Sequence, residues 1–86
     1  MTITMNTSFT ENYYQTTDLA LAAVLSLTFP LDSVDKTNPA KAHFIYKRSE
    51  GLDQLIEAYW KQEIKVEPQL YFQSLKVLKN RLYSSA

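Results

Sequence analysis

The sequence predicts a small α+β domain in which a two-stranded antiparallel hairpin packs on three helices. Two segments, 50–62 and 68–83, carry apolar residues at helical spacing, and the segment 41–48 has the aromatic and β-branched content of a strand. The chain has 86 residues, which is enough for one hydrophobic core. We therefore expect a single compact domain over residues 16–84, with the element order α-β-β-α-α.

The first predicted features are an N-terminal arm and a helix. Residues 1–15 show no clear hydrophobic period, so we expect a flexible arm there. Over 17–28 the apolar residues lie nearly all round a helix, and the alanines among them favour helix over a buried strand. Thr16 or Thr17 is positioned to cap this helix, and Asp18 in its first turn complements the helix dipole. We expect neighbouring elements to cover the helix on more than one side.

A β-hairpin is predicted to follow the first helix. Pro30 ends that helix, because proline disfavours helical backbone for the residue before it. Residues 31–36 are predicted to form a short strand, 37–40 a turn and 41–48 the second strand. One face of the second strand carries Ala42, Phe44 and Tyr46, and the other carries His43, Ile45 and Lys47. Since a lone hairpin is only marginally stable in water, it must pack against the helices.

Two further helices complete the predicted domain. Ser49 offers an N-cap for a helix over 50–62, and Pro68 suits the first position of a helix that runs to Tyr83. Residues 64–66 form the extended connector between them. The expected inward-facing residues are Leu52, Leu55, Ile56 and Tyr59 on the first of these helices, and Tyr71, Leu75, Leu78 and Leu82 on the second. Each helix thus presents one apolar stripe to the core.

Four segments of the chain point to a family. They are TTDLALAAVL, NPAKAHFIY, LIEAYWKQEIKVEP and LKNRLY, of which the Tyr-Trp pair followed by Lys-Val-Glu-Pro is the most specific. Through them residues 17–83 resemble a family of small uncharacterised domains of bacteria and their phages or mobile elements. That family commonly has aspartate before the proline, where this chain has Glu67, a weaker helix cap. The resemblance implies a compact domain and supplies no functional residues.

The composition argues against an enzyme. The chain has no cysteine, one glycine and one histidine. The lack of cysteine excludes a disulfide framework and thiolate metal sites, and Gly51 alone cannot build a phosphate-binding loop. His43 lies on a predicted strand, where a surface or partly buried role is expected rather than catalysis or metal binding. We therefore expect no catalytic residue, no cofactor, no metal and no small-molecule substrate.

The sequence also predicts a cytoplasmic protein. Its longest apolar segment, 19–31, is shorter than the roughly 20 residues that a transmembrane helix needs. No basic residue precedes this segment, so it lacks the pattern of a secretory signal. The absence of cysteine fits a reducing compartment.

A surplus of aromatic residues favours protein interaction, including self-association into a homo-oligomer. The chain has eleven aromatic residues, more than a core of this size requires. Tryptophan and tyrosine are typical anchors of protein interfaces. The aromatic residues outside the clean inner stripes that we assign to a candidate protein interface are Tyr13, Tyr14, Trp60 and Phe72. For Trp60 and Phe72 the alternative is that they close the domain's own core.

Nucleic-acid binding is the second hypothesis. Residues 41–86 carry eight Lys or Arg against five Asp or Glu, whereas the whole chain is neutral. Cationic side chains neutralise phosphates, and nearby tyrosines can stack on bases. The candidate nucleic-acid contacts are Lys41, Lys47, Arg48, Lys76, Lys79 and Arg81. The alternative is that the cations near the end of the last helix stabilise its dipole without any partner.

Overall fold

The structure is a computed structural model that describes residues 12–38 and 40–83. Its elements in chain order are β1 (Tyr13–Thr16), α2 (Leu19–Thr28), β2 (Ser33–Asp35), β3 (His43–Lys47), α3 (Glu50–Trp60) and α4 (Pro68–Tyr83). The predicted α+β class and the order of the helices and the two hairpin strands are confirmed. The structure adds one strand, β1, at the N-terminal side.

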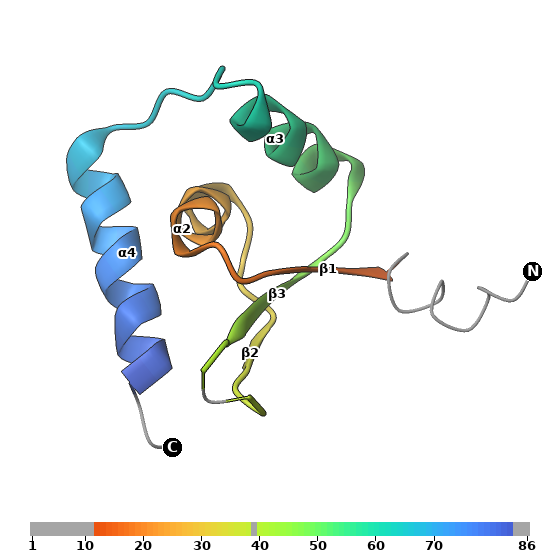
Figure 1. Ribbon diagram of the computed structural model, residues 1–86. Helices are drawn as coiled ribbons and strands as arrows, with labels where there is room; N and C mark the ends of the chain where they lie inside the picture. Colours follow the sequence, from red (N-terminus) through yellow and green to blue (C-terminus); the bar gives the residue numbers. More distant parts are fainter. Residues whose placement is uncertain (1–11, 39, 84–86) are drawn as a thin grey trace, which may run out of the picture.

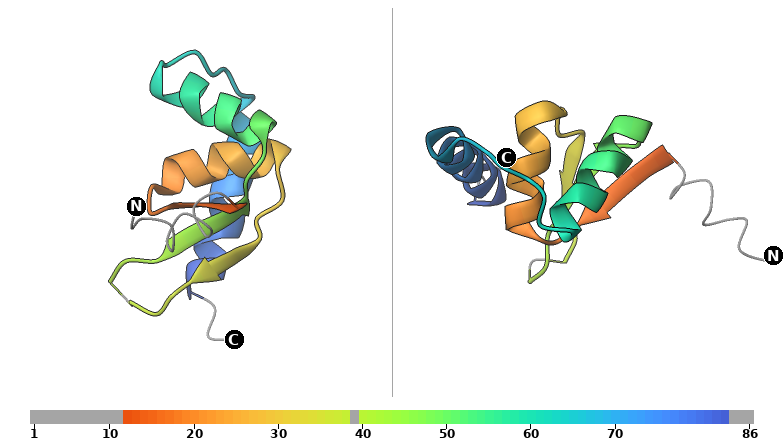
Figure 2. Two further views of the ribbon diagram at one scale, coloured as in Figure 1. Left: turned by 90° about the vertical axis from the view of Figure 1, so that its right-hand side faces the viewer. Right: turned by 90° about the horizontal axis from the view of Figure 1, so that it is seen from above.

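The helix α2 is the centre of the domain. It lies between α4 on one side and α3 on the other, with the sheet below it (Figures 1 and 2). Residues 21–25 of α2 are buried in unbroken succession. A helix that is apolar all round requires such cover on several sides. The prediction that α2 is enclosed is therefore confirmed.

The helix α2 begins two positions later than predicted. Asp18 is the N-cap, because its side-chain Oδ1 accepts a hydrogen bond of 3.2 Å from the N–H of Leu21. Thr16 lies two residues before this cap, and its Oγ1 accepts a 3.0 Å hydrogen bond from the N–H of Asp18. Both interactions satisfy backbone donors that the helix itself leaves without partners. The helix ends at Thr28, before Phe29 and Pro30, as predicted.

The sheet has three antiparallel strands in the order β1-β3-β2. In its register, Tyr14 faces Tyr46 and Val34 faces Phe44. Because side chains alternate along a strand, these four residues share the face that meets α2. Phe44 and Tyr46 are almost completely buried there, as the alternation in the sequence predicts. The opposite face of β3 carries His43, Ile45 and Lys47, which are half-buried or exposed.

The third strand corrects two predictions. The predicted arm ends at residue 15, whereas Tyr13, Tyr14 and Gln15 belong to β1 and pair with β3. The predicted two-stranded hairpin is therefore part of a three-stranded sheet. The prediction failed because β1 has only four residues, and two adjacent tyrosines hide the alternation that identifies a strand. The rest of the arm, residues 1–11, lies outside the described residues.

The two later helices follow the prediction closely. Ser49 caps α3 by accepting a 3.1 Å bond from the N–H of Leu52, and Glu67 Oε1 caps α4 with a 2.9 Å bond from the N–H of Leu70. The helix α3 ends two residues earlier than expected, because Gln62 has a φ of 62°. The N–H of Glu63 then donates to the carbonyl of Ala58 at 2.9 Å, which closes the end of the helix.

Two hydroxyl groups fasten the neighbouring elements to α2. The Tyr46 hydroxyl donates to the carbonyl oxygen of Ala22, and the Ser74 hydroxyl donates to that of Ala23, each at 2.8 Å. They tie β3 and α4 to consecutive residues of the central helix. The core that these elements enclose is formed by Leu21, Ala22, Ala23, Leu25, Phe44, Tyr46, Leu52 and Leu78. Within the described ranges, no helix is both long enough and apolar enough to cross a membrane.

Candidate functional site

The six predicted nucleic-acid contacts do not form one surface. Lys47 and Arg48 lie at one end of β3, and Lys41 lies beyond its other end, in the turn that joins β2 to β3. Lys76 and Lys79 are exposed on α4. Arg81 also belongs to α4 but lines a different flank of that helix. The structure thus separates the basic residues of β3 from those of α4.

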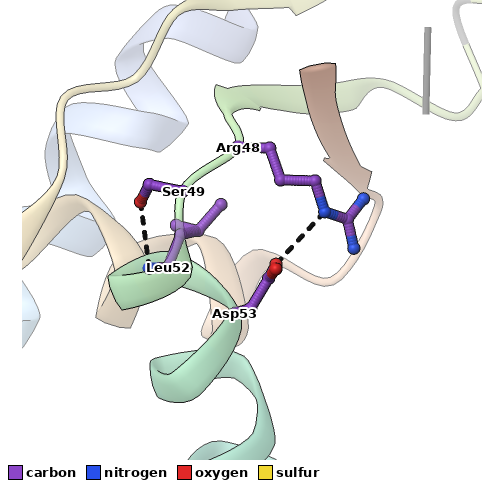
Figure 3. Close-up of polar contacts among 4 residues, drawn as sticks. All are labelled: Arg48, Ser49, Leu52 and Asp53. Atoms are coloured by element: carbon purple, nitrogen blue, oxygen red, sulfur yellow. Dashed lines mark hydrogen bonds and ion pairs between the residues drawn. The ribbon is translucent and has the colours of Figure 1, made fainter. Parts of the chain in front are cut away.

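Arg48 contacts other residues of the domain at its surface (Figure 3). Its Nε donates to Asp53 Oδ1 at 3.2 Å, directly beside the Ser49 cap of α3. Its guanidinium carbon lies 5.7 Å from the centre of the Tyr14 ring, a cation–π distance. Arg48 therefore joins β1 to the start of α3, which is a structural role for a residue that we had assigned to nucleic-acid contact.

The candidate interface aromatics are also divided. Tyr14 is half-buried on the inner face of the sheet, and burial raises the pKa of its phenol. Tyr13 is half-buried on the opposite face, where it faces Lys47. Trp60 and Phe72, in contrast, expose 61% and 60% of their surface. Only these two have the free ring area that an interface anchor requires.

Each of the two exposed aromatic rings lies against the ring of the tyrosine that precedes it in the sequence. Trp60 meets Tyr59 edge to face with ring centres 5.0 Å apart, and Phe72 lies 6.0 Å from Tyr71. Burial raises the pKa of Tyr59, and Asp18 and then Tyr71 add to the same rise. The end of α3 is thus within electrostatic reach of the start of α2 and of the start of α4.

One flank of α4 combines aromatic and basic side chains. Phe72, Lys76, Lys79 and Tyr83 follow the spacing i, i+4, i+7, i+11, which aligns them along one side of a helix. All four are exposed, and Tyr83 is 80% exposed. We call this set the aromatic–basic stripe. The inward-facing residues Tyr71, Leu75, Leu78 and Leu82 occupy the adjacent side, as the sequence predicts.

A hollow adjoins the C-terminal end of the stripe. It has a volume of about 630 Å³ and is bounded by the start of α2, the β2–β3 turn and the end of α4. Lys41 and Tyr83 both line it. Lys36 lines it too, and its Nζ donates to the carbonyl oxygen of Arg81 at 3.0 Å. Lys36 therefore holds the turn against the negative end of α4.

The other flank of α4 borders an apolar groove. The groove has a volume of about 440 Å³, lies between α4 and the end of α2, and reaches the buried Leu78. Its exposed apolar residues on α4 are Leu70 and Val77, at 54% and 59% exposure. We call it the α2–α4 groove. Its lining residues are Ser26, Leu27, Phe29, Pro30, Leu31, Leu70, Gln73, Ser74, Val77, Leu78 and Arg81.

Sequence reasoning missed the α2–α4 groove. The signal was present, because Leu70 and Val77 lie seven residues apart and off the inner stripe. Seven residues are about two helical turns, so the pair forms a second apolar stripe on α4. Its exposure depends on how α4 crosses α2, which the sequence pattern alone does not define.

Several titratable side chains form contacts within the sheet, the turn and α3. His43 is half-buried on the outer face of the sheet, next to the Asp35 position of β2. Hydrogen bonds from the hydroxyl and the N–H of Thr37 lower the pKa of Asp35 and shape the turn. Glu57 pairs with Lys61 at 3.3 Å on the solvent side of α3. Within residues 12–38 and 40–83, no three His, Cys, Asp or Glu side chains gather in an arrangement that could hold a metal ion.

Comparison with known proteins identifies the family. The sequence model of one family, described as Domain of unknown function (DUF5659), matches residues 11–84. The chain therefore belongs to this family. The matched region begins just before β1 and includes every element of the fold. No curated protein and no solved structure shows a significant match to the chain.

Proposed function

We propose that this domain is a non-enzymatic protein-interaction module and that its partner is a second copy of the same chain. The observation that carries the proposal is the α2–α4 groove. Leu70 and Val77 are more than half exposed, although they adjoin the buried Leu78. Contiguous exposed apolar surface of this kind is typical of interaction sites.

Burial of these side chains supplies a driving force for association. Complete burial of a fully exposed leucine or valine side chain is worth about 1.5–3 kcal/mol. Leu70 and Val77 are 54% and 59% exposed, so each would gain roughly half of this, twice in each dimer. Leu27, Pro30 and Leu31 widen the apolar area from the α2 side of the groove. Association must offset the entropy lost by two molecules, so a central apolar cluster is the feature that a stable dimer needs.

A second copy fits the groove by symmetry. If two α4 helices pack antiparallel about their midpoint near Gln73, Leu70 of each copy lies against Val77 of the other. This is an isologous contact, in which the same surface serves on both subunits. Gln73 and Ser74, which would lie at the crossing, carry no charge. The apolar pair Leu70 and Val77 of one copy would therefore pack against the same pair of the other copy.

Charge complementarity supports the same arrangement. Glu67 lies three residues before Leu70, and Arg81 lies four residues after Val77. Antiparallel packing consequently brings Arg81 of one copy beside Glu67 of the other, twice in each dimer. Glu67 uses Oε1 to cap α4, which leaves its second carboxylate oxygen to accept from a guanidinium. The two ion pairs would define the register of the helices.

Sedimentation equilibrium of the full chain tests the proposal. We expect a concentration-dependent mass approaching twice 9.9 kDa. Charge reversal by Arg81→Glu should weaken dimerisation at least tenfold, and the double variant Arg81→Glu with Glu67→Arg should restore it, because the pairs re-form with exchanged signs. Leu70→Asp with Val77→Asp should give a monomer.

Matched controls use the other surfaces. Phe72→Ala and Trp60→Ala remove equally exposed aromatic residues outside the groove and should leave the dimer unchanged. Circular dichroism checks that each variant is folded. A folded wild-type chain that stays monomeric up to about 1 mM would refute self-association, since a weaker constant corresponds to less than about 4 kcal/mol of binding free energy. Glu67→Arg also removes the cap of α4, so circular dichroism must show that the double variant keeps its helix content. Failure of such a folded double variant to restore dimers would refute the antiparallel register.

We also propose a cytoplasmic location and an origin in bacteria or in their phages or mobile elements. The location is supported by the absence of cysteine from the sequence. The origin is supported by the four short segments quoted above. Cell fractionation and the gene neighbourhood test the two statements: recovery of the native protein outside the cytoplasm would refute the first.

A further inference from the structure

We infer that the aromatic–basic stripe of α4, together with Lys41 beside its end, binds single-stranded nucleic acid. The stripe consists of Phe72, Lys76, Lys79 and Tyr83, and it lies on the opposite flank of α4 from the α2–α4 groove. The inference is therefore independent of the proposed self-association. Both surfaces can be occupied at once.

The cations of this surface are available to an anion. Within the described residues, no ion pair or hydrogen bond engages the ammonium groups of Lys41, Lys76 or Lys79. The helix α4 has no acidic residue, and the described lining of the adjoining hollow has none either. The surface thus carries uncompensated positive charge although the whole chain is neutral. Such charge attracts phosphates and releases their counterions.

Stabilisation of the helix dipole does not explain these lysines. The dipole acts within the last turn of a helix, where Lys36 and Arg81 already meet the need. Lys76 lies about two turns before the end of α4. A cation at that position interacts little with the terminal carbonyls. Lys76 lies instead between the two exposed aromatic residues of the stripe.

The aromatic residues identify the type of nucleic acid. Phe72 and Tyr83 stand at the two ends of the stripe, about 16 Å apart along the axis at 1.5 Å per residue. Exposed rings interleaved with cations form a platform on which unpaired bases stack while lysines hold the phosphates. The bases of a duplex already stack on each other and offer no free faces. The surface therefore favours a single strand over a duplex.

Fluorescence anisotropy with the full chain tests the site. The probe is a labelled oligothymidylate of about 20 nucleotides, titrated at low salt. We expect weak binding that declines as salt rises. In Lys76→Ala with Lys79→Ala, the slope of log affinity against log salt should fall by about 1.4, since each neutralised phosphate of a single strand contributes about 0.7. Phe72→Ala and Tyr83→Ala should each lower the affinity at least fivefold, whereas Tyr83→Phe should bind like the wild type.

The controls separate a local site from general charge. Lys47→Ala and Lys65→Ala remove exposed cations outside the stripe and should change the affinity less than twofold. Leu70→Asp with Val77→Asp carries extra negative charge, so Leu70→Ser with Val77→Ser is the proper variant to show that binding survives loss of the groove. This variant also separates a failure of dimerisation from a failure of nucleic-acid binding.

Several results would overturn the inference. A flat titration up to about 100 μM protein, the weak end of non-specific nucleic-acid affinity, would exclude the site. Equal losses from Lys47→Ala and from the stripe variants would show a diffuse charge effect. Duplex DNA that binds as tightly as the single strand would exclude stacking. Polyglutamate that competes as well as the oligonucleotide at equal charge would assign the surface to acidic polypeptides instead.

Discussion

At the scale of single residues, Tyr46 shows how the domain combines burial with hydrogen bonding. Its ring is fully buried in the core, and its hydroxyl bonds to the carbonyl of Ala22 and to the hydroxyl of Ser26, each at 2.8 Å. A buried hydroxyl without partners would cost free energy, so these bonds make the tyrosine compatible with the core. Burial raises the pKa of Tyr46, because the phenolate would have to form in an apolar environment.

Tyr46→Phe should change both the stability and its dependence on pH. At neutral pH we expect the free energy of unfolding to fall by about 1–2 kcal/mol, because two hydrogen bonds are lost. Above pH 10 the unfolded chain loses the phenolic proton first, so the stability of the wild type should decline as the pH rises through the raised pKa. The decline should be shallower in Tyr46→Phe. Burial also raises the pKa of Tyr14 and Tyr59, so part of the alkaline loss of stability should remain in Tyr46→Phe.

Urea denaturation at pH 8 and at pH 11 measures this prediction. Tyr83→Phe is the matched control, because Tyr83 is largely exposed. Equal alkaline losses in the wild type and in Tyr46→Phe would contradict the role of the buried phenol.

Gln62 provides a second prediction at this scale. Its φ of 62° lies in the left-handed region, which costs an L-residue about 1 kcal/mol and suits glycine at the end of a helix. Gln62→Gly should therefore raise the free energy of unfolding by about 0.5–1 kcal/mol. Gln54→Gly, in the exposed interior of α3, should instead lower it by about 1 kcal/mol. Thermal denaturation of both variants checks the pair: a lower stability of Gln62→Gly would contradict the assigned backbone strain.

At the scale of elements, β1 is the part of the fold that the sequence did not predict. It adds a third strand to the predicted hairpin and places the Tyr14 ring against the core. It also leads directly into the Thr16 and Asp18 bonds that begin α2. A short edge strand thus supports both the sheet and the central helix.

The contribution of β1 can be measured by truncation. A fragment of residues 17–86 should lose at least about 2–3 kcal/mol of stability relative to the full chain, because the buried surface of Tyr14 and the hydrogen bond from the Asp18 N–H to Thr16 Oγ1 are lost. A fragment of residues 11–86 retains β1 and serves as the control. Chemical denaturation of the two fragments gives the difference. Equal stabilities would show that β1 adds nothing to the stability of the domain.

At the scale of the whole molecule, sequence patterns predicted the core better than the surface. Leu52, Leu78, Phe44 and Tyr46 were placed correctly, because helical and strand periods state directly which side of an element is apolar. The two flanks of α4 were not distinguished. Whether Val77 is covered or exposed depends on the angle at which α4 crosses α2, and that angle arises from the packing of the complete domain.

The predicted nucleic-acid contacts do not form one surface, because their positions also depend on the packing of the complete domain. Arg48 lies close to Lys47 in sequence and was grouped with it, yet its side chain turns back to Asp53 and Tyr14. Lys76 and Lys79 were grouped with Arg81, which faces the other flank of the helix. Clusters of charge in a sequence become clusters in space only where the helical period aligns them. Phe72 and Tyr83 join the lysines because their spacing satisfies that condition.

The strand order has a consequence for synthesis on the ribosome. The middle strand of the sheet is the last of the three to be made, and Tyr13 must wait for Lys47, 34 positions later, before it can pair. The helix that covers the remaining side of residues 21–25 comes later still. A nascent chain that is interrupted before α4 therefore leaves one side of its most apolar helix exposed, and exposed apolar surface favours aggregation. The cover of α2 is therefore complete only after α4 has been made.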